Sequence, residues 1–86
     1  MARRIVFLDG ERVEMPPKEF DILAELVGRA GRPVGASELA KRVWPPEERA
    51  SIGDVHRHIY RLRRALGPRG EALVANRRGF GYVLEA

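Results

Sequence analysis

The alternation of apolar and polar positions divides the chain into a short hairpin, three helices and a second hairpin. Residues 5–8 are apolar and rich in β-branched side chains, and they end at Asp9-Gly10, a strong signal for a two-residue hairpin turn. Residues 11–14 leave room for a short second strand. A small β-hairpin is therefore predicted at the start of the chain.

The first helix is predicted to begin after Pro16-Pro17, because proline is tolerated in a first helical turn, where its missing N–H would be unpaired anyway. Gly31 and Pro33 are expected to end it. Apolar residues recur there at spacings of three and four, which predicts a buried stripe. This stripe consists of Phe20, Leu23, Ala24, Val27 and Ala30, widened by Ile22 and Leu26.

Two more helices follow by the same criterion. Residues 36–44 are predicted to form a short second helix that ends at Pro45-Pro46, with a buried face of Leu39, Ala40, Val43 and Trp44. The third helix is predicted to start at Ser51 or Ile52 and to end at Gly67-Pro68. Its apolar positions are spaced 3-4-3-4 and are Ile52, Val55, Ile59, Leu62 and Leu66.

The last segment, 72–84, is predicted to form two strands around a glycine-containing turn at residues 76–81. A hairpin, three helices and a closing hairpin are typical of an α+β winged helix-turn-helix, with the third helix as reader and the last hairpin as wing. We expect residues 1–86 to form one domain: an N-terminal β-hairpin over 1–15, a three-helix core over 16–67 and the wing over 72–84.

The distribution of charge along the chain indicates where a binding surface lies. The 86 residues carry 16 basic and 12 acidic side chains, a net charge of +4. Residues 1–54 hold nine basic and ten acidic residues (−1), whereas residues 55–86 hold seven Arg against Glu71 and Glu85 (+5), which together recover +4. A positive charge confined to the last third of a small domain indicates an anionic partner, often nucleic acid.

The third helix would present most of that charge on one face. At about 100° per residue, its apolar stripe lies opposite Arg57, Tyr60, Arg61 and Arg64. Arg can grip a phosphate with two hydrogen bonds and can bond bidentately to guanine in the major groove. The residues predicted at the groove are Gly53, Asp54, Arg57 and Arg61, with Arg64 nearer the backbone. Tyr60 is also a predicted DNA contact. The alternative is a merely solvated basic face, which the lack of interleaved Glu disfavours.

The tip of the last hairpin repeats this chemistry. Residues 77–82 contain two Arg, two Gly and two aromatic residues, and Gly79 and Gly81 permit the positive φ of a tight turn. An Arg-bearing tip can enter a minor groove, where negative potential attracts guanidinium groups. Arg77, Arg78 and Tyr82 are therefore predicted DNA contacts of the wing.

Other functional classes find little support. The chain has no Cys and no Thr, and only Ser37 and Ser51 as hydroxyl nucleophiles, so neither a thiolate metal site nor catalysis is expected. His56 and His58 lie about 200° apart on a helix, which argues against a metal pair. No cofactor is predicted. No apolar run approaches a membrane span or a secretory signal, so a cytoplasmic protein is expected.

Four segments resemble the winged-helix DNA-binding (effector) domain of OmpR/PhoB-type bacterial response regulators. They match the first helix, the second helix with its terminal Trp, the recognition helix and the wing of that family. The resemblance runs over about residues 15–83, and four motifs in this order with these gaps are highly specific. The segments are residues 17–23 (PKEFDIL), 39–44 (LAKRVW), 55–66 (VHRHIYRLRRAL) and 78–82 (RGFGY).

The resemblance implies double-stranded DNA as partner, with the third helix in the major groove and the wing in the neighbouring minor groove. It implies that Arg57 and Arg61 read bases, that His58 and Arg64 contact the DNA backbone, and that Arg78 is the wing residue. It also implies that the 45–50 loop can touch RNA polymerase, and that a weak or DNA-induced homodimer can form. The alternative function is a winged helix used as a protein–protein interaction module with an acidic partner.

The chain also departs from the family pattern. His56 stands where the family usually has Asp, Arg57 where it has an apolar residue, and Pro16 where a Thr usually caps the first helix. The first 15 residues have room for two strands rather than the usual four. There is no room for a receiver domain with its phosphoacceptor aspartate, so we expect either a stand-alone DNA-binding protein or an excised domain.

Overall fold

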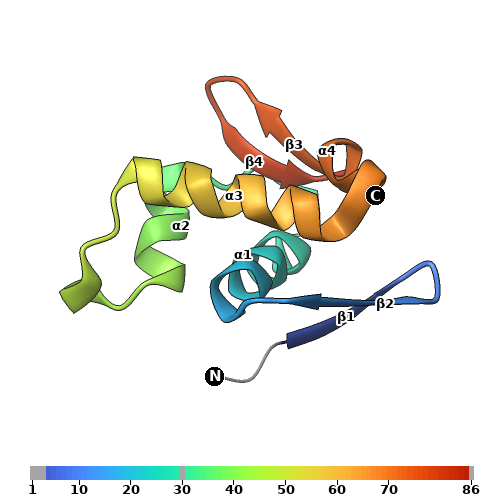
Figure 1. Cartoon of the computed structure of the whole chain (residues 1–86). Helices are drawn as coiled ribbons and strands as arrows, with labels where there is room; N and C mark the ends of the chain where they lie inside the picture. Colours follow the sequence, from blue (N-terminus) through green and yellow to red (C-terminus); the bar gives the residue numbers. More distant parts are fainter. Residues whose placement is uncertain (1–3, 30, 86) are drawn as a thin grey trace.

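The computed structural model describes residues 4–29 and 31–85, and it confirms the predicted α+β winged-helix fold (Figure 1). Two antiparallel hairpins flank three main helices. Their order is β1 (Arg4–Leu8), β2 (Glu11–Met15), α1 (Pro17–Gly28), α2 (Ala36–Val43), η1 (Pro46–Glu48), α3 (Ile52–Leu66), η2 (Gly67–Arg69), α4 (Gly70–Leu73), β3 (Val74–Arg77) and β4 (Gly81–Leu84). None of the helices in the described ranges combines the length and apolarity needed to cross a membrane.

The N-terminal hairpin forms as predicted. β1 and β2 pair antiparallel, from Arg4 opposite Met15 to Leu8 opposite Glu11. Asp9 and Gly10 both have positive φ, 50° and 83°, which is the backbone of a tight two-residue hairpin turn. Met15 is fully buried, while Val6 and Leu8 pack against the core from β1. The hairpin therefore closes one side of the helical core.

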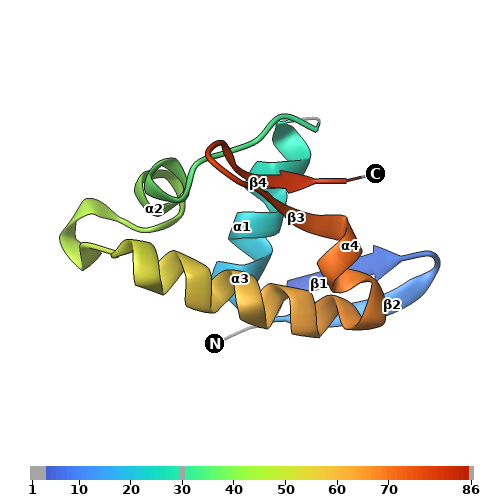
Figure 2. The ribbon, with the colours of Figure 1, turned by 90° about the horizontal axis from the view of Figure 1, so that it is seen from above.

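Strand β4 of the wing packs against α1, while α3 lies across the core, packed against α1, α2, α4 and β2 (Figures 1 and 2). The apolar stripe of α3 faces this core: Val55, Ile59, Leu62 and Leu66 are all buried. The predicted fifth member, Ile52, is instead 45% exposed. Ile52 is the first residue of the helix, where no helical turn precedes it to pack beside it against the core.

The buried face of α1 differs from the predicted stripe. Ile22, Leu23 and Leu26 are buried, but Ala24 and Val27 are exposed, and Ala30 lies outside the described residues. The remaining member of the buried face is the carboxylic acid Glu19, 1% exposed. Residues 19, 22, 23 and 26 follow the i, i+3, i+4, i+7 spacing of one helix face. The first residue of the buried face is therefore Glu19, which a count of apolar residues leaves out. The predicted stripe included Ala24 and Val27 instead, and these lie on the exposed side.

Helix α2 agrees with its prediction more closely. It ends at Val43, and Trp44 follows as an extended C-terminal cap whose side chain is 8% exposed. Leu39 and Val43 are buried, and Ala40 packs partly buried against the same core. The short α2 thus contributes buried apolar side chains to the core against which α3 packs.

An isolated antiparallel β-bridge attaches the wing to the core. Val34 exchanges both backbone hydrogen bonds with Tyr82 of β4, at 2.7 and 2.9 Å. Gly81 beside it has φ 126°, and a Cβ there would lie 2.3 Å from the Val34 carbonyl oxygen. Segment 67–73, predicted as a turn leading into a strand, instead forms η2 and α4. Leu73 therefore ends a helix, and β3 starts at Val74.

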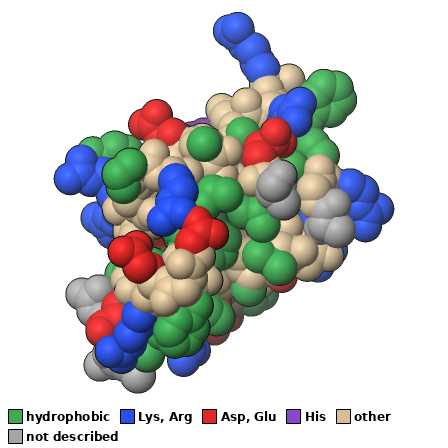
Figure 3. Space-filling view, turned by 90° about the vertical axis from the view of Figure 1, so that its right-hand side faces the viewer, with side chains coloured by type: hydrophobic (Ala, Val, Ile, Leu, Met, Phe, Trp, Pro, Cys, Tyr) green, Lys and Arg blue, Asp and Glu red, His purple; other side chains and the backbone are tan. Residues whose placement is uncertain are grey.

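An apolar groove lies between the N-terminal hairpin and the base of the wing. Hydrophobic side chains gather in the middle of this side of the molecule (Figure 3). They come from β1, α1, the end of α3, α4 and β4, so this groove marks where the two hairpins approach the same helices. Its lining is Val6, Leu8, Leu23, Val27, Leu66, Leu73, Leu84 and Glu85.

Gly81 and Gly79 offer a matched test of the wing attachment, because both have positive φ but only Gly81 touches a neighbouring backbone. Gly79→Ala should cost about 1 kcal/mol of unfolding free energy from backbone strain. Gly81→Ala adds a collision with Val34 and should cost about 3 kcal/mol or more. Urea denaturation followed by circular dichroism measures both. Equal losses for the two variants would show that the Val34 contact does not constrain the wing.

Candidate nucleic-acid interface

Helix α3 begins with a reciprocal capping box. The Ser51 hydroxyl accepts the backbone N–H of Asp54 at 3.1 Å, and Asp54 Oδ2 accepts the backbone N–H of Ser51 at 2.8 Å. Both bonds satisfy donors that a helix start would otherwise leave unpaired. The first turn of α3, which carries Asp54 and Arg57, is therefore held in a defined geometry.

Asp54 uses its second oxygen for a different task. Its Oδ1 forms an ion pair with the Arg57 guanidinium, one helical turn further along. The hydrogen bonds from Ser51, reinforced by Arg57, hold the pKa of Asp54 below its ordinary value of 3.8. One carboxylate thus caps the helix and orients an arginine on its outer face.

The outer face of α3 carries the predicted basic cluster. Arg57, Tyr60, Arg61 and Arg64 are all exposed, on the side opposite the buried stripe. Within residues 4–29 and 31–85, no carboxylate pairs with Arg61 or Arg64, whereas Arg57 pairs with Asp54. This face therefore presents positive charge that the chain itself does not neutralise.

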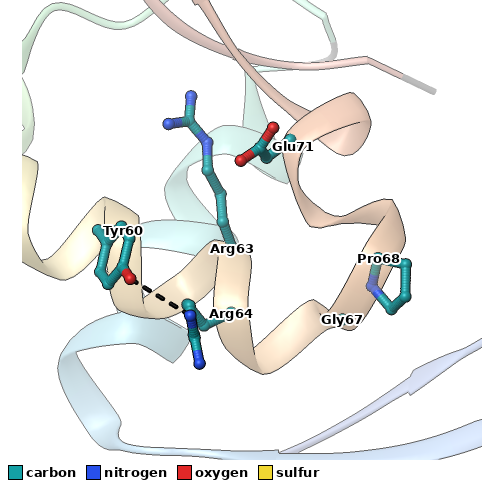
Figure 4. Close-up of a pocket in the computed structure, with 6 residues that line it drawn as sticks. All are labelled: Tyr60, Arg63, Arg64, Gly67, Pro68 and Glu71. Carbon is teal, nitrogen blue, oxygen red and sulfur yellow. Dashed lines mark hydrogen bonds between the residues drawn. The ribbon is translucent and has the colours of Figure 1, made fainter.

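Near the end of α3 the arginines point in different directions (Figure 4). Arg64 donates to the Tyr60 hydroxyl at 3.3 Å and lies 5.8 Å from the centre of its ring. Arg63 instead extends toward the wing, where its Nε donates to the Val74 carbonyl at 2.8 Å. Arg64 and Tyr60 thus belong to the outer face, while Arg63 joins α3 to β3.

The wing ends in a tight basic turn. The Phe80 N–H donates to the Arg77 carbonyl at 2.8 Å, and Gly79 between them has φ 85°. Arg77 also donates to Glu85 at 2.8 Å. Arg78 is exposed and has no carboxylate partner in the described part of the chain. Phe80 is 75% exposed. The tip therefore combines an uncompensated guanidinium with an exposed aromatic ring.

Tyr82 lies inside the wing base rather than on its surface. It is 5% exposed, and burial raises the pKa of its hydroxyl. That hydroxyl forms a short hydrogen bond with Nδ1 of His56 on α3, and the two rings meet edge to face at 5.7 Å. The Arg63 guanidinium carbon also lies over the Tyr82 ring, 5.8 Å from its centre. Tyr82 therefore joins the wing to α3.

His58 is likewise turned toward the core. Its side chain is 17% exposed, and its Nδ1 lies 3.1 Å from Oε2 of the buried Glu19. The ring also packs edge-on against Trp44, with centroids 5.3 Å apart. Oε1 of Glu19 is buried without a hydrogen-bond partner. The His58–Glu19 contact connects α3 to α1 directly beneath the outer face.

The structure brings most of the predicted DNA-contacting residues to two neighbouring surfaces, but not all of them. It exposes Arg57, Tyr60, Arg61 and Arg64 on α3 and Arg77 and Arg78 on the wing, with Asp54 half-buried at the helix start. His58 and Tyr82 lie behind these surfaces. The described residues contain no group of three His, Cys, Asp or Glu side chains that could hold a metal ion.

Sequence reasoning missed four residues that shape this region: Glu19, His56, Arg63 and Phe80. Glu19 and His56 make contacts between elements far apart in the chain, for which helical periodicity carries no signal. Phe80 could have been found, because it sits between two glycines at the predicted hairpin tip, where no neighbouring side chain can bury it.

The low pKa of Asp54 predicts an acid-sensitive helix start. Because the folded-state pKa lies below the ordinary 3.8, the stabilisation from Asp54 is complete above pH 3.8 and is lost as pH falls below it through the folded-state pKa. Subtracting the pH–stability curve of Asp54→Asn from that of the native chain should isolate this loss. A constant difference across pH 2–6 would rule out the proposed bonds to the ionised carboxylate.

The buried Glu19–His58 contact predicts a graded response to substitution. Glu19→Ala leaves the His58 ring without its partner and should cost about 1–3 kcal/mol in unfolding free energy. Glu19→Gln retains an acceptor oxygen and should cost less. Glu14→Ala, on an exposed strand position, serves as control and should change little. If Glu19→Gln destabilises as much as Glu19→Ala, the hydrogen bond to His58 is not the source of the effect.

Comparison with known proteins places this geometry in a family. The family described as "Transcriptional regulatory protein, C terminal" matches residues 10–84. The transcriptional regulatory protein BasR of Escherichia coli is 35% identical over 86 residues, covering all of this chain and 37% of BasR. The sensory transduction protein RegX3 of Mycolicibacterium smegmatis is 33% identical over 87 residues, covering 99% of this chain and 38% of RegX3. The chain thus spans little more than a third of these relatives.

Solved structures share the fold. A chain of RitR carrying the C128D substitution superposes with a TM-score of 0.83 at 27% identity, over 94% of this chain and 36% of that one. The DNA-binding domain of the response regulator AdeR, solved in complex with an intercistronic region, has a TM-score of 0.80 at 22% identity, over 94% and 84% of the two chains. These likenesses show the fold, and the family match with the curated relatives identifies the chain as a member of the OmpR/PhoB-type family of winged-helix domains, which bind DNA in transcription regulation.

Proposed function

We propose that this domain binds double-stranded DNA sequence-specifically, with α3 in the major groove and the β3–β4 wing in the adjacent minor groove. The observation that carries the proposal is the placement of arginines without a carboxylate partner. Arg61, Arg64 and Arg78 have none among the described residues, and all three lie on α3 or the wing tip. Elsewhere, Arg12, Arg29, Arg42 and Arg69 each pair with a carboxylate. Arg4, Arg32 and Arg49 also lack a carboxylate partner among the described residues, but they are scattered over other parts of the chain. The gathering of unpaired arginines on α3 and the wing tip therefore supports the proposal.

The shape of α3 supports this placement. Its 15 residues correspond to about 22 Å of helix length. The major groove of B-DNA is wide enough to admit an α-helix. The buried stripe fixes the opposite face outward, and the wing is joined to α3 through His56, Tyr82 and Arg63. One rigid unit therefore presents both surfaces at once, which suits neighbouring grooves on one duplex.

Within this unit we assign different roles to the charged residues. Arg57 lies in the N-terminal half of α3, where a recognition helix enters the groove, and Arg61 follows one turn later on the same face, so we assign both base contacts. Asp54 orients Arg57. Arg64, with Tyr60, lies further along and contacts the sugar–phosphate backbone, as do Arg77 and Arg78 at the wing. His58 and Tyr82 act from behind the surface, by fixing α3 against α1 and the wing.

Two further partners belong to the same proposal. The loop over residues 45–50 is exposed at Pro46, Glu47, Glu48 and Arg49, and it lies beyond the start of α3, away from the wing (Figure 1). We propose it as the surface for RNA polymerase. We also propose a weak homodimer that forms on DNA, because adjacent copies on a direct repeat would each use the same α3 and wing.

The DNA proposal is tested by fluorescence anisotropy with a duplex first selected from a random library. Affinity should fall steeply between 50 and 200 mM salt, on the order of a hundredfold or more, because bound arginines release counterions from the phosphates. Arg61→Ala should cost about 1–3 kcal/mol on the selected site and relax the preference at one base position.

Arg12→Ala removes the same charge from the N-terminal hairpin, on the opposite side of α3 from the wing, and should leave affinity nearly unchanged (Figure 1). Absence of measurable DNA binding at low salt would refute the proposal and favour an acidic protein partner for the basic face. Equal weakening of all sequences by Arg61→Ala would assign Arg61 to a phosphate instead of a base.

A further inference from the structure

Phe80 is the most exposed of the large hydrophobic side chains in the described ranges, at 75%. Two residues later along the same hairpin, Tyr82 is 5% exposed and fixed by hydrogen bonds. The contrast shows that the wing has an interior capable of burying an aromatic ring, and that Phe80 is left outside it. If a ligand covers this ring, apolar surface leaves water, which favours binding.

The backbone holds Phe80 in this exposed position. On one side, its N–H closes the turn to the Arg77 carbonyl at 2.8 Å. On the other side, Gly81 lies against the Val34 carbonyl and cannot shift without breaking that packing. Val34 and Tyr82 then lock the strand with two hydrogen bonds. Little backbone conformational entropy is therefore lost when a ligand covers the ring, which favours binding.

The surroundings of Phe80 indicate the chemistry of that ligand. Arg77 and Arg78 precede the ring in the same turn, and Arg78 has no carboxylate partner in the described residues. The complementary surface is anionic at its rim and flat and apolar within. The sugar–phosphate walls of a DNA minor groove supply the anionic rim, and base faces supply the apolar part when a base step is opened. Minor-groove proteins frequently insert apolar side chains such as Phe between base steps and kink the duplex.

We propose that Phe80 is a wedge that enters one minor-groove base step, unstacks it partly and bends the DNA toward the major groove. The proposal rests on the proposed function, since the wing must reach the minor groove for Phe80 to act. It adds a residue that reads DNA deformability: flexible pyrimidine–purine steps open at lower cost than stiff A-tracts. Phe80 would thereby favour particular sequences without a hydrogen bond to any base.

The experiment uses the selected duplex with 2-aminopurine placed in turn at each position of the wing half-site, and a second duplex with dyes at both ends. The native chain should raise 2-aminopurine fluorescence at one step and increase energy transfer between the ends. Phe80→Ala should abolish both signals and weaken binding by about tenfold, the loss of one stacking contact. Phe80→Leu, which retains an apolar wedge, should restore most of the bend.

Phe7 supplies the matched control, because it is 70% exposed on the N-terminal hairpin and lies opposite Arg12 in the strand pair. Phe7→Ala should leave the fluorescence, the bend and the affinity unchanged. Both substitutions remove exposed rings, so both variants should keep the native melting temperature. If Phe80→Ala binds and bends DNA like the native chain, the wedge proposal is wrong while the proposed function stands. If the native chain itself shows no DNA binding, the proposed function fails instead.

Discussion

The packing of the apolar stripe of α3 against the core determines how the functional side chains of this helix are presented. Val55, Ile59, Leu62 and Leu66 are buried in the core, where α3 packs against α1, α2, α4 and β2. Because a helix has 3.6 residues per turn, burying these positions places Arg57, Arg61 and Arg64 on the opposite, solvent-facing side, and no other contact is needed to orient them. Burial of an aliphatic side chain contributes about 1.5–3 kcal/mol each, so this orientation is strongly favoured over a rotated helix.

Some arginines are neutralised within the fold, whereas three unpaired ones gather on α3 and the wing tip. Around the helices, Glu38 accepts hydrogen bonds from both Arg29 and Arg42, and Arg42 most strongly holds its pKa below the ordinary value. On α3 and the wing tip, Arg61, Arg64 and Arg78 lack such partners within the described residues. Like charges on one face repel one another, and DNA phosphates would relieve that repulsion. A surface built for binding is thus less than optimal for stability.

Local signals in the sequence were sufficient for the fold class and for the exposed half of the interface. Asp9-Gly10 specifies a turn by its own backbone preference, and the 3-4 spacing of α3 specifies its faces, so both were predictable. The contacts of Glu19 with His58 and of His56 with Tyr82 were not, because they join residues 39 and 26 positions apart. These same contacts explain why His58 and Tyr82, expected at the DNA, face inward. Segment 67–73 was misassigned because Gly67-Pro68 signals a turn but not the short helices that follow.

The central claim, that one rigid surface made of α3 and the wing meets DNA, is tested most directly by mapping backbone amide chemical shifts on adding the selected duplex. We predict the largest changes at Arg57, Tyr60, Arg61 and Arg64 and at Arg78 and Phe80, with Phe7 and Arg12 on the N-terminal hairpin unaffected. Changes centred on the N-terminal hairpin, or on the apolar groove between the hairpins, would contradict the account.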